Sequence, residues 1–186
     1  MHPPSTLEFA LAGLLRQKPQ SGYDLRKTFV TTAMRHYSDS PGSIYPALRR
    51  LEARGWIAVS PEHNPPPRER RGRTAYHLTG KGIQSLVEWL SLPVHRDDVI
   101  WRLPELMLRF AFMDGNVPRS TTLGFLGEFE RELAEYLAGL EANLEEMTSK
   151  FPMHTGVLAF LSGIHAMEAQ LAWARQARAW LSEDAR

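Results

Sequence analysis

The 186-residue chain contains no cysteine. A disulfide framework, a thiolate metal site and a cysteine nucleophile are therefore excluded, and a reducing compartment suits the sequence. No apolar run approaches the roughly 20 residues that span a bilayer, and the first residues lack the basic and apolar regions of a secretion signal. We therefore expect a cytoplasmic protein without membrane contacts.

Catalytic motifs are lacking as well. Residues 79–82, Thr-Gly-Lys-Gly, do not form a phosphate-binding loop, because the leading glycine is absent and Gly82 replaces the metal-binding Ser or Thr. The sequence has no Gly-x-Ser-x-Gly and no His-Glu-x-x-His. His154 and His165 could share a helix face, but no further metal ligands accompany them. The sequence thus predicts no enzyme, no cofactor and no metal.

Charge is unevenly distributed, although the net charge is only +1. Residues 1–90 carry 13 Lys/Arg against 7 Asp/Glu, a net +6, whereas residues 91–186 carry 9 against 14, a net −5. A basic half joined to an acidic half indicates that only the first contacts phosphates. We expect a DNA-binding domain over residues 1–92 and a helical domain over residues 93–186.

The first half begins with two expected helices. Ser5 and Glu8 form a capping box for a helix that ends near Lys18. Ser21 can cap a short second helix that ends near Thr32.

A third helix is expected between Ser40 and Gly55. Ser40 is the expected N-cap, Pro41 is the first helical residue, where its missing N–H costs nothing, and Gly55 ends the helix. Four apolar residues recur at helical spacing as its buried stripe: Ile44, Ala47, Leu48 and Leu51. The remaining side chains lie elsewhere around the helix: Ser43, Tyr45, Pro46, Arg49 and Arg50.

Bulky residues recur at alternate positions in residues 56–60 and 74–79, a pattern that predicts two antiparallel strands. The loop between them contains three consecutive prolines, so it should be extended, and it is strongly positive. Its arginines, up to the second strand, are Arg68, Arg70, Arg71 and Arg73. Thr79 then caps a fourth helix. This order of elements is that of a winged helix-turn-helix, so the fold class is mainly α with a small two-stranded β wing.

The second half predicts only helices. A short helix around residues 104–112 and a break at Asp114, Gly115 and Pro118 precede two long helices, over residues 119–149 and after Pro152. The first has one apolar face: Leu126, Phe129, Leu133, Leu137, Leu140, Leu144 and Met147. The second long helix also has one apolar face: Val157, Leu161, Ile164, Met167, Leu171 and Ala174. Because such an antiparallel pair cannot cover itself, we expect it to form a homodimer.

The third helix suits the major groove because its leading end is small. Pro41, Gly42 and Ser43 let the backbone approach, and the positive end of the helix favours a phosphate. Ser43 and Tyr45 add hydroxyl groups, and Arg49 can reach a base edge or a phosphate. For Tyr45 we favour DNA contact over a core position, and for the arginine-rich loop DNA contact over a solubilising role. Arg50 is slightly more typical of a surface charge paired with an acid.

Four blocks of the first 90 residues resemble the PadR family of transcriptional regulators: residues 7–15, 21–25, 40–52 and 73–82. The block Ser-Pro-Gly-Ser-Ile-Tyr-Pro-Ala-Leu-Arg-Arg-Leu-Glu is the most specific. The two long C-terminal helices are similar to the dimerisation part of the family's larger subgroup. The resemblance implies a homodimeric repressor that binds double-stranded operator DNA and is released by a small molecule. It also implies that Gly22 and Tyr23 add a backbone contact.

Candidates for effector binding are Trp101, His154 and Trp173. The alternative, favoured for the tryptophans, is that Trp101, Trp173 and Trp180 lie in a core or an interface, as aromatic residues of helical bundles usually do. Two other functions stay open: a helical protein-interaction module whose winged helix does not bind DNA, and a small catalytic domain in the acidic half, for which no nucleophile and base are visible.

Overall fold

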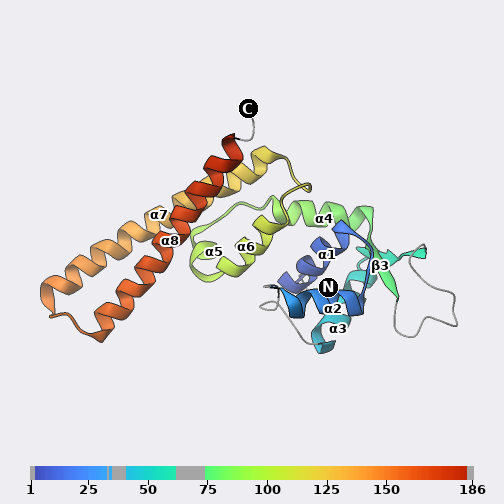
Figure 1. Ribbon diagram of the computed structural model, residues 1–186, viewed down its shortest axis with the longest axis horizontal. Coiled ribbons are helices and arrows are strands. Elements are labelled where there is room, and N and C mark those ends of the chain that lie inside the picture. The colour runs from blue at the N-terminus through green and yellow to red at the C-terminus, as the bar shows by residue number, and fades with distance from the viewer. Residues whose placement is uncertain (1–2, 33, 35–40, 62–73, 184–186) are drawn as a thin grey trace. The chain divides into compact units, whose positions relative to one another are not determined.

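The computed structural model describes residues 3–32, 34, 41–61 and 74–183. The chain divides into two compact units, Met1–Leu90 and Ser91–Arg186 (Figure 1). Among the described residues, no helix has the length and apolar character needed to cross a membrane.

The first unit contains four helices and a small sheet in its described part. The helices are α1 (Thr6–Gln17), α2 (Gly22–Thr31), α3 (Pro41–Ala53) and α4 (Gly80–Leu90). The strands are β1 (Gln20–Ser21), β2 (Ile57–Val59) and β3 (Ala75–Leu78). They form an antiparallel sheet in the order β1-β3-β2. Helix α1 packs against α3, α4 and β3 and so lies at the centre of the unit.

Side-chain caps explain where these helices begin. The Ser5 hydroxyl accepts from the Glu8 amide at 3.3 Å, and the Glu8 carboxylate accepts from the Ser5 amide at 2.8 Å. Ser21 and Asp24 repeat this reciprocal arrangement at α2. Thr79 accepts from the Gly82 amide at 3.2 Å at the start of α4. The starts predicted from the sequence for these three helices are therefore confirmed.

The sheet has one strand more than the two expected. Gln20 and Ser21 pair with Tyr76 and Ala75. The buried Gln20 amide also donates to the Leu14 carbonyl at 3.0 Å. A two-residue strand is too short to show alternation, so the sequence could not reveal it.

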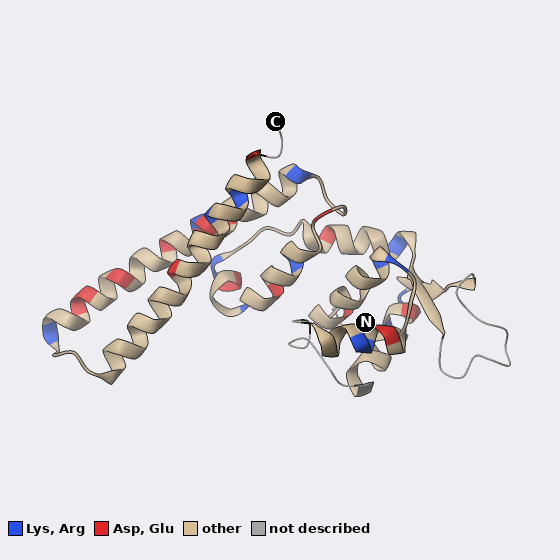
Figure 2. Ribbon diagram, viewed as in Figure 1, with Lys and Arg blue, Asp and Glu red and all other residues tan. Residues whose placement is uncertain are grey.

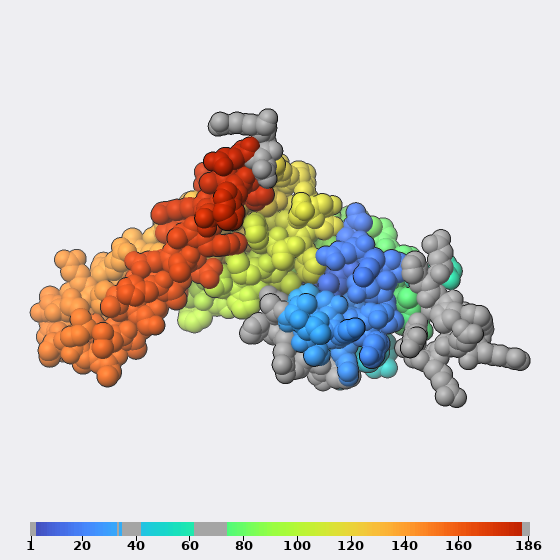
Figure 3. Space-filling model, in the orientation of Figure 1, coloured from blue at the N-terminus to red at the C-terminus, as the bar shows by residue number. Residues whose placement is uncertain are grey.

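The second unit contains α5 (Arg96–Trp101), α6 (Leu103–Ala111), α7 (Arg119–Lys150) and α8 (Thr155–Glu183). The long α7 and α8 pack against each other along their length (Figure 3). The predicted short helix and both long helices are confirmed, with Gly115 at φ 69° in the break between α6 and α7. The six-residue helix α5 was not anticipated, because it is too short for a periodic apolar pattern.

The apolar stripes of α7 and α8 are only partly buried within one chain. On α7 the stripe residues Leu126, Phe129, Leu133 and Leu137 are buried. The last three residues of the stripe, Leu140, Leu144 and Met147, remain partly exposed. On α8 the stripe residues Leu161 and Met167 also remain partly exposed. Acidic positions are spaced along α7 (Figure 2), so this unit does not suit a polyanionic partner.

A buried arginine fixes the first residues of the second unit. Arg109 on α6 is 3% exposed, donates to the Leu92 carbonyl and lies 5.2 Å from the centre of the Phe125 ring. The Glu128 carboxylate on α7 accepts from the Val94 amide at 2.8 Å. Burial lowers the pKa of Arg109, and nearby carboxylates, Glu128 among them, oppose that shift. The segment that follows α4 is therefore held by α6 and α7.

Candidate nucleic-acid interface

Helix α3 presents two distinct faces. Its four predicted core residues, Ile44, Ala47, Leu48 and Leu51, are each at most 3% exposed. Tyr45 is 42% exposed, and Arg49, one turn later, is exposed as well. Residues four apart lie on the same side of a helix, so Tyr45 and Arg49 form one outward-facing surface. The expectation that Tyr45 lies outside the core is confirmed.

The leading end of α3 consists of small residues. The helix begins at Pro41, as predicted, with Gly42 exposed and Ser43 half-buried in its first turn. That turn contains no acidic residue that would oppose the positive end of the helix dipole. At the other end, Gly55 has φ 71°, the left-handed conformation expected of a helix-ending glycine.

Gly22 connects the start of α2 to this surface. A Cβ atom on Gly22 would lie 2.6 Å from Cε1 of Tyr45, so the Tyr45 ring rests directly against the glycine backbone. Tyr23, the next residue, is 58% exposed. The fold thus brings Gly22, and with it the neighbouring Tyr23, to Tyr45, which lies more than 20 residues later in the sequence. We call Tyr23, Gly42, Ser43, Tyr45 and Arg49 the α3 surface; Gly22 is itself buried behind the Tyr45 ring.

The two consecutive arginines of α3 have different roles. The Arg50 Nε lies 2.6 Å from Oε1 of Glu8, a carboxylate that is 1% exposed. Arg49 takes part in none of the ion pairs found in the described part of the chain. The interpretation of Arg50 as a paired charge is therefore confirmed, and Arg49 is the arginine that stays available on the α3 surface.

Comparison with known proteins shows which family this unit is similar to. The model of the transcriptional regulator PadR-like family matches residues 11–88. The negative transcriptional regulator PadR of Bacillus subtilis (strain 168) is 33% identical over 84 residues, which are 45% of this chain and 44% of that protein. The first unit is therefore similar to the PadR-like family over residues 11–88. The sequence match thus covers less than half of the curated relative's length.

Solved structures of PadR-like proteins are also similar over most of the chain. Bacillus subtilis PadR in complex with operator DNA is 22% identical, with 95% of this chain and 99% of that chain covered and a TM-score of 0.43. The same protein with p-coumaric acid is 22% identical, with 96% and 99% covered and a TM-score of 0.41. A PadR-like regulator from Bacillus cereus is 23% identical, with 96% and 99% covered and a TM-score of 0.40.

Several predicted contact residues of the first unit lie outside the described residues: Ser40, Arg70, Arg71 and Arg73. Strands β2 and β3, which flank the arginine-rich segment, pair in an antiparallel ladder from Ile57–Leu78 to Val59–Tyr76. Contact between the arginine-rich segment and DNA stays a prediction.

The three effector candidates do not meet within one chain. Trp101 on α5 is 78% exposed. His154 is exposed just before α8, and its Nδ1 accepts from the Gly156 amide at 3.1 Å. Trp173 is 19 residues further on, about 28 Å along a helix. It is half-buried and packs edge-on against Phe110 and Phe129, with ring centres 5.3 and 6.0 Å away. The core interpretation therefore fits Trp173 but not Trp101.

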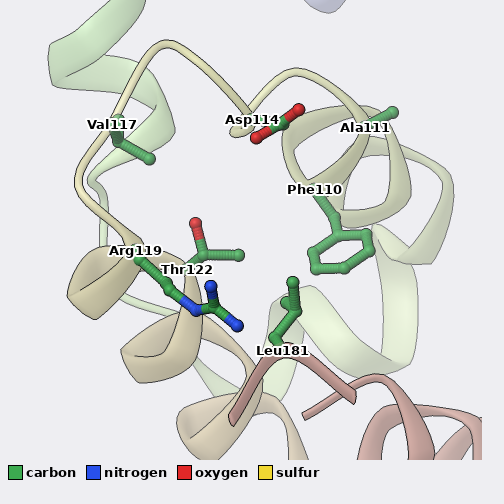
Figure 4. Close-up of a pocket in the computed structure, with 7 residues that line it drawn as sticks. All are labelled: Phe110, Ala111, Asp114, Val117, Arg119, Thr122 and Leu181. Atoms are coloured by element: carbon green, nitrogen blue, oxygen red, sulfur yellow. The ribbon is translucent and has the colours of Figure 1, made fainter. Parts of the chain in front are cut away.

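A cavity of about 450 Å³ lies elsewhere in the second unit (Figure 4). Residues of α6, the α6–α7 loop, α7 and α8 line it: Phe110, Ala111, Asp114, Val117, Arg119, Thr122 and Leu181. Sequence analysis did not link these residues, because Leu181 lies 71 positions after Phe110 and they share no motif. The break at Gly115 and Pro118 was the only available signal. Among the described residues, no cluster of His, Asp or Glu could hold a metal ion.

Proposed function

We propose that this PadR-like regulator is a homodimeric repressor that binds double-stranded operator DNA through the α3 surface and is released by a small molecule. One observation carries the proposal: the Tyr45 ring packs directly on Gly22, and the exposed Arg49 lies one turn further along α3. A helix enters the major groove with its outer face, and a small leading end permits a close approach. The α3 surface has both properties, and it lies in the half of the chain with net charge +6.

The mode of binding follows from the chemistry of these residues. The Arg49 guanidinium can donate two parallel hydrogen bonds to a guanine edge or to a phosphate. The Tyr23 and Tyr45 hydroxyls suit phosphate oxygens, and the positive end of the α3 dipole favours a phosphate nearby. Phosphate contacts fix the position of the protein on the DNA duplex, whereas a contact from Arg49 to a base edge would distinguish one base sequence from another.

The experiment is a titration of the protein with DNA from upstream of its own gene at several salt concentrations. Each phosphate contact contributes about −0.9 to the slope of log K against log salt, so several contacts give a steep decline. No binding at low salt, or an affinity that does not change with salt, would contradict the proposal. The first outcome would favour a winged helix that binds protein.

The proposed dimer uses the partly exposed end of the α7–α8 pair. Leu140, Leu144 and Met147 continue the buried stripe of α7 and stay partly exposed within one chain, although α8 packs along the helix. A second copy would bury them, which stabilises association by about 25 cal/mol per Å² of apolar surface. We expect light scattering to give twice the 21.1 kDa chain mass at micromolar concentration. A replacement of Leu144 by Glu should shift it towards monomer, whereas Ser149→Glu, at an exposed position one turn further along α7, should not.

A smaller prediction concerns Gly22. Its replacement by alanine places a methyl group where the Tyr45 ring lies, and the ring can move because it is partly exposed. We expect DNA affinity to fall severalfold while the free energy of unfolding changes by less than about 1 kcal/mol. Gly124→Ala, at an exposed helical position with open space around it, is the matched control. Unchanged DNA affinity in Gly22→Ala would show that the position of Tyr45 does not matter.

A further inference from the structure

Residues 91–95, which we call the connector, join α4 of the first unit to α5 of the second unit (Figure 1). A flexible linker between domains is typically rich in Gly and Ser and makes few contacts. The connector, Ser-Leu-Pro-Val-His, contains no glycine, and the ring of Pro93 restricts the backbone at its centre. Its composition is therefore that of a stiff connection.

The backbone of the connector is fastened to the second unit at two points. The buried Arg109 guanidinium of α6 donates to the Leu92 carbonyl. The Val94 amide donates to the Glu128 carboxylate of α7 at 2.8 Å, and the Val94 side chain is 2% exposed. We call these four residues the clamp. It leaves Ser91 as the only residue between the end of α4 and the held part of the connector.

The end of the connector is held as well. The His95 amide donates to the Asp98 carboxylate at 3.1 Å where α5 begins, and Arg96 pairs with Glu135 of α7 at 2.8 Å. The Arg96–Glu135 pair is exposed, so it contributes little by itself. The clamp holds the backbone directly, and its two hydrogen bonds each have a charged partner, which makes them stronger than neutral ones. The clamp is therefore the main restraint on the connector.

We propose that Arg109 is a positioning residue for DNA recognition, and that the clamp restricts the protein to operators with one spacing between their half-sites. This rests on the proposed function, because it requires a dimer whose two α3 surfaces bind one duplex. One base pair added between two half-sites moves one of them by about 3.4 Å and turns it by about 35° around the duplex axis. A freely swinging connector tolerates such a change, whereas a connector held one residue after α4 does not.

The binding of one α3 surface to one half-site does not involve the clamp, because all four clamp residues belong to the second unit. A loosened clamp should therefore leave the affinity for a single half-site unchanged and alter only the dependence on spacing. A purely structural role of Arg109 would instead lower the affinity for every duplex alike, through the loss of folded protein.

Affinity is measured on the part of its own upstream DNA that the protein protects in a footprint, on duplexes with base pairs added or removed at its centre, and on one half alone. Two added base pairs should weaken binding of the unmodified protein by at least about tenfold, because one α3 surface no longer reaches its half-site. Arg109→Met, which removes the donor but keeps an apolar stem, should reduce this loss to about threefold or less. The control, Arg102→Met, removes an exposed arginine that pairs with Asp98 at 3.6 Å, and should keep the full loss.

Two glycines inserted between residues 90 and 91 provide a second variant. Arg109→Met can fail to fold, because the carboxylates near Arg109 lose their cation. The insertion leaves every clamp contact in place and lengthens only the free part of the connector, so it should flatten the dependence on spacing in the same way. Two glycines inserted after Met153, in the exposed turn between α7 and α8, are the control and should not.

The clamp proposal and the proposed function fail in different ways. Equal affinity of the unmodified protein for all spacings, or an unchanged dependence on spacing after the insertion at residue 90, would overturn the clamp proposal while DNA binding is intact. An unchanged dependence on spacing in folded Arg109→Met would exclude Arg109 as the positioning residue. Absence of DNA binding by the unmodified protein would instead overturn the proposed function, and the role of the clamp with it.

Discussion

Arg49→Ala is expected to weaken operator binding by about tenfold or more, without lowering the free energy of unfolding. A bidentate arginine contact to a base or phosphate is worth about 1–3 kcal/mol, and a dimer makes the contact twice. Arg49 is exposed and has no ion-pair partner among the described residues, so the folded protein loses no contact of that kind. Fluorescence anisotropy with labelled upstream DNA measures the affinity, and chemical denaturation measures the stability.

The control for this change is Arg175→Ala, which removes the same charge from an exposed position on α8 in the other unit. It should alter DNA affinity by less than twofold, since charges beyond a Debye length of about 8 Å are screened at physiological salt. Equal losses for Arg49→Ala and Arg175→Ala would mean that only net charge matters, and would exclude Arg49 from the interface.

Arg50→Ala should give the opposite result. Glu8 is 1% exposed, and this change removes its cationic partner while the carboxylate stays buried. A buried charge without its partner is costly, but Arg50 is 49% exposed and solvent weakens the pair, so we expect a loss of about 1–3 kcal/mol of stability. DNA affinity of the folded protein should change less than in Arg49→Ala.

A double-mutant cycle separates this pair from other effects. Glu8→Gln alone keeps the capping geometry but removes the charge, and Arg50→Ala in that background should cost clearly less than in the unmodified protein. If Arg50→Ala is as stable as Arg49→Ala, the ion pair contributes nothing and the two arginines are equivalent surface charges.

Local signals in the sequence were sufficient to predict most helices. Ser5, Ser21 and Thr79 each provide a hydroxyl that satisfies a first-turn amide, and Gly55 adopts the positive φ that its position requires. The periodicity of α3 correctly separated its buried side from Tyr45. Such features depend on a few neighbouring residues, which is why the sequence alone reveals them.

Features that depend on tertiary contacts were not predictable. The contact between Gly22 and Tyr45 joins two motifs that the sequence pointed to separately, and only the packing of α2 on α3 brings them together. The cavity arises where residues 110–122 meet the distant Leu181, and the two-residue strand β1 is defined by its pairing with β3. Trp101, an effector candidate by residue type, is exposed, because α5 packs through other residues such as the buried Val99.

Backbone amide NMR of the full chain with and without operator duplex tests the account most directly. Shift changes should concentrate at Gly22, Tyr23 and the first two turns of α3, through Arg49, and should be small along α7 and α8. Changes confined to the α7–α8 pair, or a silent α3 in the presence of bound DNA, would contradict the assignment of the α3 surface as the DNA-binding face.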